Sequence, residues 1–323
     1  MRSMIVRRLE GPAALEPVER PDPVPGPTEV RIDVHACGCN FGDLLIVAGK
    51  YQLKPELPFA PGSEVCGVVR DVGAAVDAIR PGQRVFAVLP WGGYASVVAV
   101  EAARVVEIPE AMSFVEGAAF GVAYQSAHLA LVDRGCLRQA ETVLVHGAAG
   151  GVGLAAVEVA VALGGRVIAT ARGAEKCELV RERGASVVCD SDEDWENVVR
   201  SATDGRGADL VFDPIGGDTF ERSTRILAFG GRLLVVGFAS GEIPSMKMNR
   251  LMLKNVAVVG LNWGAYRDDH PARLATVSAE LFTLHAAGRI RPWVSKTYRL
   301  EEAAAALADL ASRASTGKVV LVP

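Results

Sequence analysis

The sequence predicts an α/β protein with a β-rich first domain and a doubly wound parallel sheet in its second part. Three observations predict this class. The chain has 323 residues, half of them hydrophobic, which is ample for two buried cores. Short apolar runs separated by turn signals fill the part before Ser113. After Ser113, apolar strand-like runs alternate with helical stretches, as in a parallel sheet with crossover helices.

The first part contains short strand-like runs separated by P-D-P-V-P-G-P, two P-G turns and W-G-G. This pattern indicates a small β-barrel or a distorted sandwich. The expected strands are Glu29–Val34, Gly67–Val72, Arg84–Val88 and Tyr94–Val100.

The second part begins with a helical stretch, Phe114–Leu131, and a strand starting at Thr142. The alternation that follows predicts parallel strands with helices on both faces. Expected helices are Gly153–Leu163, Glu175–Arg183, Trp195–Thr203 and Phe220–Leu227, and expected strands are Arg166–Thr170, Ser186–Cys189, Asp209–Asp213, Arg232–Phe238 and Asn255–Leu261. The tail adds helices Ala272–Ala287 and Glu301–Ala311 and strands Val294–Arg299 and Lys318–Val322, and we expect it to return to the first domain.

A glycine-rich turn joins the Thr142 strand to an alanine-rich helix, in the sequence T-V-L-V-H-G-A-A-G-G-V-G. Glycines at 147, 150 and 153 allow backbone N–H groups to approach a pyrophosphate at the start of a helix. The alternative is a strand-to-helix turn that binds nothing. The first reading makes the whole turn a phosphate cradle, formed by Gly147, Ala149, Gly150, Gly151, Val152 and Gly153.

Composition excludes several other classes of protein. A formal net charge of -4 offers no basic surface for nucleic acid. No apolar run is long enough to cross a membrane, and the charged N-terminus does not resemble a signal peptide. The six cysteines show no C-x-x-C spacing, so we expect reduced thiols and a cytoplasmic protein.

Several segments together resemble the medium-chain dehydrogenase/reductase superfamily, in its zinc-free quinone-oxidoreductase (zeta-crystallin-like) branch. They are A-C-G-C-N-F-G-D, P-G-S-E-V-C-G-V-V, P-G-Q-R-V, H-G-A-A-G-G-V-G, F-D-P-I-G-G, G-G-R-L-L-V-V-G-F-A-S-G and T-G-K-V-V-L, in the family's order along nearly the whole chain. The resemblance implies a GroES-like catalytic domain, residues 1–122 and 266–323, and a Rossmann NADP-binding domain, residues 123–265.

The resemblance also implies that no catalytic zinc is bound. Asn40 stands at the position of a cysteine ligand of the zinc-dependent relatives, and Ser63 stands at the position of their histidine ligand, beside a retained Glu64. The four-cysteine lobe of those relatives is absent. Since zinc needs about four nitrogen or sulfur ligands, we expect no metal and an acceptor that takes hydride without a Lewis acid.

The end of the second Rossmann strand predicts NADPH as the cofactor. NAD enzymes place an acid there, whereas this chain has Thr170 and Arg172, with Lys176 one helical turn further on. A guanidinium suits a phosphate, although both cations could instead be ordinary surface residues. Asp190 departs from the aromatic residue that the family often places near the adenine, and this acid weighs against a 2′-phosphate.

Other expected cofactor contacts follow the strand ends or come from the resemblance. Asn40 resembles the family asparagine beside the nicotinamide, with a turn-capping role as the alternative. Ser126 matches a Thr or Ser directed at the carboxamide, and Lys318 resembles a basic residue at the nicotinamide end. The remaining expected contacts lie after sheet strands, at Gly216, Phe238, Ala239, Ser240, Leu261, Asn262 and Trp263.

Tyr51 is the strongest catalytic candidate, together with Asn40. It matches the tyrosine that related enoyl-thioester reductases use as a proton donor, and a phenol can hydrogen-bond a developing enolate. Quinone-reducing relatives also have a tyrosine at this position, and the alternative is that it only shapes the pocket there. Tyr124 and Trp263 are expected to line the acceptor site, with core packing as the alternative.

The first hypothesis is therefore an NADPH-dependent, zinc-independent reductase that transfers hydride to a quinone or an α,β-unsaturated carbonyl in a cleft between the domains. One alternative is an enoyl-thioester or alkenal reductase with Tyr51 as the acid. Another, of a different class, is a nucleotide-binding protein with a structural or RNA-binding role. The apolar segment Lys254–Gly260 could form an edge strand, which predicts a homodimer.

Overall fold

The computed structural model describes residues 1–323, which form two compact units. The first unit comprises Met1–Val122 and Pro292–Pro323, and the second comprises Ala123–Arg291. The change of unit at 122 falls inside helix α2 (Phe114–His128).

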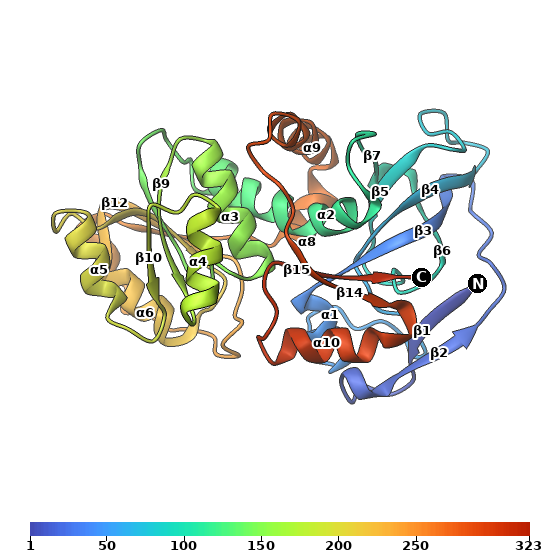
Figure 1. The fold of residues 1–323 in the computed structure, drawn as a ribbon, viewed down its shortest axis with the longest axis horizontal. Coiled ribbons are helices and arrows are strands. Elements are labelled where there is room, and N and C mark those ends of the chain that lie inside the picture. Colours follow the sequence, from blue (N-terminus) through green and yellow to red (C-terminus); the bar gives the residue numbers. More distant parts are fainter. The chain divides into compact units, whose positions relative to one another are not determined.

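The first unit is built mainly on antiparallel strands, with one parallel pair, β14 and β15 (Figure 1). Its larger sheet runs in the order β14-β15-β3-β4-β5-β7, with β6 paired to β3, and its smaller sheet pairs β1 with β2. The strands are β1 (Arg2–Val6), β2 (Leu15–Glu19), β3 (Glu29–Cys39), β4 (Glu64–Val72), β5 (Arg84–Val88), β6 (Val97–Glu101), β7 (Val105–Glu107), β14 (Val294–Arg299) and β15 (Lys318–Val322).

Strand β3 is longer than the sequence predicts. Its second half is buried on both faces and therefore lacks the alternation of apolar and polar residues that marks a strand in the sequence. Burial alternates along Glu29–Val34, which is the pattern that sequence analysis detects, but Ala36–Cys39 is buried continuously. Both edges of this half are paired, with β4 on one side and β15 on the other. Two helices pack on the core of this unit, α1 (Phe41–Val47), which the sequence analysis did not predict, and α10 (Ala303–Ala311).

The second unit contains a six-stranded, all-parallel sheet in the order β10-β9-β8-β11-β12-β13. Its strands read as continuous apolar runs because helices cover them. They are β8 (Thr142–Val145), β9 (Arg166–Ala171), β10 (Val187–Asp190), β11 (Ala208–Asp213), β12 (Leu227–Val235) and β13 (Ala257–Gly260). The predicted fold class, a β-rich domain and a domain with a doubly wound parallel sheet, is confirmed.

Helices connect these strands and bury their apolar faces on the sheet. Helix α3 follows the glycine turn and is almost wholly buried, which explains its lack of a polar face. Helices α5 and α6 lie side by side and pack Trp195, Val199 and Phe220 against the sheet (Figure 1). The helices are α3 (Gly151–Ala162), α4 (Ala174–Glu182), α5 (Trp195–Ala202), α6 (Gly217–Ile226), α7 (Asn249–Lys254), α8 (Trp263–Asp269) and α9 (Pro271–Ala286).

Helix α9 belongs to the second unit, whereas the predicted boundary at 265/266 assigned it to the first domain. The reason is a set of polar contacts that the sequence does not reveal. Gln125 donates to Ser278 at 3.0 Å, and Arg273 forms an ion pair with Asp133 at 2.8 Å. These contacts hold α9 against the start of the Rossmann unit, so the chain leaves that unit only after Arg291.

No helix is long and apolar enough to span a lipid bilayer.

Candidate active site

The glycine turn between β8 and α3 has the geometry that its sequence predicts for a phosphate cradle. Gly147 has a φ of 56°, in the left-handed region that glycine favours. A Cβ on Gly153 would lie 2.2 Å from the Gly147 carbonyl oxygen, so only glycine lets α3 begin this close to the turn. No side chain caps α3, which leaves the first N–H groups of the helix for a ligand.

A buried hydrogen-bond chain supports the turn from behind. The His146 ring bonds through Nδ1 to Thr170 at 2.9 Å and through Nε2 to Ser223 at 2.8 Å. Burial lowers the pKa of His146 to about 3, so the ring is neutral. Thr170 also accepts the Ala148 N–H with its carbonyl, 3.0 Å away. The Thr170 side chain, predicted to contact the cofactor, is buried and used within this chain of bonds.

The turn after β9 and the start of α4 each carry a cation. Arg172 is 66% exposed and pairs with the exposed Asp192 at 3.2 Å. Lys176 lies near it on α4, and its pKa is lowered by desolvation and by the positive charge of Arg172. A neighbouring anion would relieve this repulsion. The pair therefore suits a phosphate group.

Asp190, the acid that weighed against a phosphate, is held by backbone groups. One carboxylate oxygen accepts the Gly173 N–H at 2.7 Å and the other accepts the Asp192 N–H at 3.0 Å. These bonds lower the pKa of Asp190. The side chain thus serves to shape the turn that carries Arg172.

The loops after β11, β12 and β13 meet at the same edge of the sheet, as the carboxyl ends of parallel strands do. The β12 loop is bonded to the β11 loop through Ala239 N–H to Pro214 oxygen (3.0 Å) and Ser240 N–H to Ile215 oxygen (2.9 Å). Leu261 N–H donates to Val235 oxygen at 3.0 Å. The structure therefore brings together a set of predicted contacts, Gly216, Phe238, Ala239, Ser240, Leu261 and Asn262.

Asp213, at the end of β11, fixes the loop that contains Gly216. Its buried carboxylate accepts the N–H groups of Ile215 and Gly216, at 2.8 and 3.0 Å. Burial raises the pKa of Asp213. Gly216 has a φ of 73°, and a Cβ there would lie 2.9 Å from the Phe238 ring. These two constraints hold the β11 and β12 loops close together.

Three other predicted residues have structural surroundings in the second unit. Tyr124, expected in the acceptor pocket, is buried, and its hydroxyl donates to Glu158, which also pairs with Arg183 at 2.8 Å. Ser126 is buried on α2. Trp263 begins α8 with the Arg267 guanidinium 5.2 Å from its ring centroid, and its indole N–H is buried without a hydrogen-bond partner.

Asn40, Glu64 and Lys318 form a buried cluster in the first unit. The Lys318 ammonium donates to Asn40 Oδ1 at 2.6 Å and to Glu64 Oε1 at 2.5 Å. The Asn40 amide donates to the same Glu64 oxygen at 2.9 Å and to Ser63 at 3.1 Å. Lys318 and Glu64 are 5% and 1% exposed. Sequence analysis singled out Asn40 and Lys318 separately, but it did not predict that they touch.

Asp43 supports this cluster from the first turn of α1. It accepts the Asn40 N–H at 2.8 Å and the Tyr94 hydroxyl at 3.3 Å. Burial raises the pKa of the Asp43 carboxyl to about 6. Tyr51 is half-buried and lies over Gly42, where a Cβ would be 3.8 Å from the phenol ring. The phenol therefore packs against the short segment that begins at Asn40.

The residues at this cluster do not fit a zinc ion. Nowhere in the chain do three His, Cys, Asp or Glu side chains gather so that they could hold a metal. At the two positions that resemble ligand sites stand an amide, Asn40, and a hydroxyl, Ser63, which bond each other. A lysine ammonium already donates to the Asn40 and Glu64 oxygens. The ammonium thus occupies the oxygens that a metal would need, and the remaining donors, an amide and a hydroxyl, are not the thiolate and imidazole ligands that zinc prefers.

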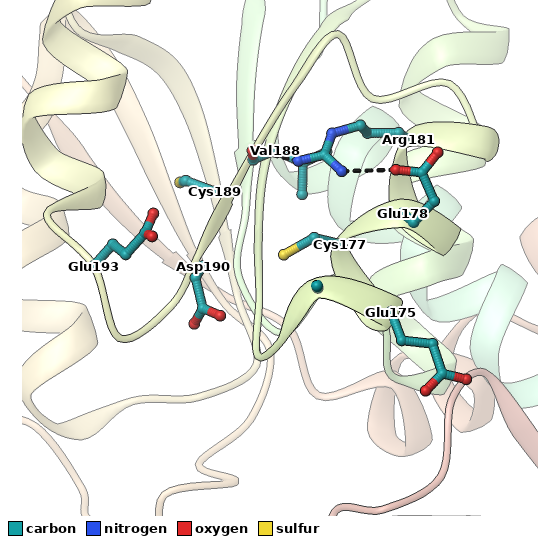
Figure 2. A pocket seen from close by; sticks show the side chains of 9 residues that line it. Glu175, Cys177, Glu178, Arg181, Val188, Cys189, Asp190 and Glu193 are labelled. Carbon is teal, nitrogen blue, oxygen red and sulfur yellow. Dashed lines mark hydrogen bonds and ion pairs between the residues drawn. The ribbon is translucent and has the colours of Figure 1, made fainter.

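A separate groove of about 530 Å³ lies between α4 and β10. Figure 2 shows the Glu178–Arg181 ion pair at one end and Asp190 with Glu193 at the other. Its four carboxylates, those of Glu175, Glu178, Asp190 and Glu193, outnumber the one guanidinium. The groove is unsuited to an anionic ligand.

Comparison with known proteins gives the family. Residues 26–110 match the family described as alcohol dehydrogenase GroES-like domain, and residues 151–279 match the zinc-binding dehydrogenase family. The chain is 40% identical to quinone oxidoreductase-like protein 2 of Bos taurus, over 99% of this chain and 92% of that protein. It is 37% identical to quinone oxidoreductase of Pseudomonas aeruginosa, over 97% of both.

A solved structure agrees with these sequence matches. The crystal structure of Escherichia coli quinone oxidoreductase complexed with NADPH is 32% identical, covers 100% of both chains and superposes with a TM-score of 0.93. A GroES-like unit joined to a Rossmann unit defines the medium-chain dehydrogenase/reductase superfamily. Within that superfamily the chain belongs to the quinone oxidoreductase family and is an oxidoreductase.

Proposed function

We propose that this chain is an NADPH-dependent oxidoreductase that reduces a quinone or an α,β-unsaturated carbonyl without a catalytic metal. The observation that carries the proposal is the Lys318 ammonium bonded to Asn40 and Glu64, at the place where metal-dependent relatives need ligands. Alcohol oxidation by such relatives uses a Lewis acid. Conjugated acceptors take hydride more readily and do not require one.

The second unit supports NADPH as the cofactor. The open N–H groups at the start of α3 suit a pyrophosphate, and Arg172 with Lys176 suits a further phosphate on the ribose. The NADPH complex of the Escherichia coli relative is consistent with this choice. When bound, NADPH supplies a hydride. The residues of this chain hold the dinucleotide in place and orient it.

Stopped-flow measurement of NADPH oxidation tests the proposal. We expect turnover with 9,10-phenanthrenequinone, slower turnover with crotonyl-CoA and weaker use of NADH. Tight NADPH binding without turnover of any acceptor would instead favour a binding protein with a structural or RNA-binding role. Stoichiometric zinc in the purified protein, measured by elemental analysis, would contradict the metal-free part of the proposal.

The position of Tyr51 favours a second candidate, an enoyl-thioester or alkenal reductase. Its half-buried phenol lies over Gly42, next to the segment that begins at Asn40. A phenol there could give its proton to the enolate left by hydride addition. Tyr51→Phe removes the proton and keeps the ring. Under this reading the variant loses crotonyl-CoA reduction by roughly 10²–10⁴-fold and keeps quinone reduction, whereas equal small losses would exclude the acid role.

A further inference from the structure

We propose that Lys318 is a catalytic residue whose ammonium stabilises the negative charge that develops on the acceptor oxygen. It would thereby do electrostatically what a metal does in zinc-dependent relatives. This inference rests on the proposed reductase function and names the group that polarises the acceptor.

The strand register places the three members of the cluster side by side. Strand β15 runs antiparallel to β3, with Val319 opposite Cys39, so Lys318 falls opposite Asn40 at the end of the pair. On the other side of β3, Glu64 lies opposite Gly38. The cluster therefore spans three adjacent strand ends, and its members lie 254 and 278 positions apart in sequence from Lys318.

Gly38 gives the Glu64 carboxylate room to reach across β3. A Cβ on residue 38 would lie 2.4 Å from Glu64 Oε1 and 2.1 Å from the Ala118 carbonyl oxygen. The other carboxylate oxygen, Oε2, accepts the Val122 N–H at 2.8 Å. Glu64 is thus held on both oxygens, and its position sets that of the ammonium.

One hydrogen-bond donor of the cluster is left for a ligand. Both Asn40 N–H groups donate, to Ser63 and Glu64, and its oxygen accepts from Lys318. A lysine ammonium has three N–H donors, and Lys318 uses two of them, on Asn40 and Glu64. Its third N–H has no partner in the structure. It is the one donor of the cluster available to a substrate oxygen.

The energetics of the pair argue for a role beyond stability. Removing an ammonium and a carboxylate from water costs several kcal/mol for each ion, and a buried pair rarely stabilises more than an apolar pair of similar shape. A charge fixed in a dry site by two partners is, however, well suited to a developing oxyanion, because it needs no reorganisation during the reaction. Asn40 and Glu64 act as positioning residues for that charge.

The reduction balances without a proton from Lys318. Hydride addition puts two electrons on the acceptor and leaves an anionic oxygen, an enolate or a hydroquinone monoanion. The third N–H of Lys318 donates a hydrogen bond to that oxygen and keeps its proton. A proton from water then completes the neutral product, while the cofactor leaves in its oxidised form.

The test uses a probe that does not depend on turnover. The full-length protein without cofactor is titrated with 4-nitrophenol, whose anion absorbs in the visible range and resembles a hydroquinone monoanion. We expect wild type to bind the anion preferentially, lowering the apparent pKa of the bound phenol by about one unit or more, which is 1.36 kcal/mol per unit. Lys318→Met should abolish that shift. The double variant Glu64→Gln/Lys318→Met should do the same without leaving a buried unpaired carboxylate.

Kinetics with 9,10-phenanthrenequinone separate this role from cofactor binding. We expect kcat of both Lys318 variants to fall by roughly 10²–10³-fold, as when an oxyanion donor is removed, with the Kd for NADPH within threefold. Lys296→Met is the matched control, since Lys296 is an exposed lysine of the same unit paired with Asp309 at 2.8 Å. It should change neither readout.

Two results would overturn the inference. One is an unchanged 4-nitrophenol shift with kcat within threefold of wild type. The other is a Kd for NADPH raised tenfold or more with kcat preserved at saturation, which would make Lys318 a cofactor-holding residue. Failure of the proposed function would give a different result. Wild type would then bind 4-nitrophenolate but would not oxidise NADPH, whichever acceptor is added.

Discussion

Replacing Arg172 with alanine should convert a preference for NADPH into near indifference between NADPH and NADH. Arg172 is 66% exposed, and its ion-pair partner, Asp192, is 65% exposed, so the folded protein should lose less than about 0.5 kcal/mol of stability. The loss should appear in binding of the 2′-phosphate, which only NADPH carries.

The magnitude follows from the exposure of the guanidinium. Two unit charges about 4 Å apart attract by about 1 kcal/mol in water and about 4 kcal/mol in a medium of dielectric constant near 20. Charge-assisted hydrogen bonds contribute about 1.5–3 kcal/mol. For an exposed residue we take about 1.5–2.5 kcal/mol, which raises the Kd for NADPH roughly 10–70-fold.

Fluorescence titration of the cofactor-free protein with NADPH and with NADH measures this effect. Arg181→Ala is the matched control, because Arg181 is an exposed arginine of α4 that pairs with Glu178 at 2.9 Å. It should leave both affinities within twofold. The Arg172→Ala effect should also shrink at high salt, since exposed charges are screened. If Arg172→Ala weakens both cofactors alike, the phosphate assignment is wrong.

Three further predictions concern the turn, the cluster and the sheet edge. Gly153→Ala places a Cβ 2.2 Å from the Gly147 oxygen, although Cβ contacts under 3.0 Å do not occur. The variant should therefore lose about 1–3 kcal/mol of unfolding free energy in urea and bind NADPH at least about tenfold more weakly. Normal stability and affinity would contradict the close approach. Burial raises the pKa of Asp43 from 3.8 to about 6, so its contribution to stability is full below pH 3.8 and falls as pH rises through 6. Relative to Asp43→Asn, wild type should therefore lose up to about 3 kcal/mol between pH 4 and 7, and a constant difference would refute this. The free edge of β13, preceded in the chain by the exposed Met252 and Leu253 of α7, predicts a homodimer in light scattering, and a monomer would rule it out.

Sequence alone predicted the elements whose signal is local. The alternation of apolar runs and helices located every strand of the parallel sheet, because buried parallel strands are apolar throughout. It missed α1, whose seven residues are too few for a clear helical period. It also ended β3 at Val34, where alternation stops, although the strand continues to Cys39 between two neighbours.

The candidate site shows the same difference between local features, which the sequence predicts, and long-range contacts, which it does not. The glycine turn and the cations at Arg172 and Lys176 are encoded in short continuous segments, so the sequence alone could predict a phosphate cradle and a second phosphate contact. The burial and the hydrogen-bond partners of single side chains could not be predicted from such segments. Tyr124 and Thr170 were plausible ligand contacts by position, but burial directs their hydroxyls to Glu158 and His146.

The amino-acid sequence by itself determined the family, the order of the two folds and the glycine turn proposed to hold a dinucleotide, because each depends on residues close together in the chain. Only the tertiary structure decided that Lys318, Asn40 and Glu64 form one buried cluster. Lys318 reaches Asn40 and Glu64 because three strands from distant parts of the chain pair in one register, with Gly38 leaving space for the carboxylate. Strand pairing and burial depend on residues far apart in the chain, so no local sequence pattern could have predicted that contact.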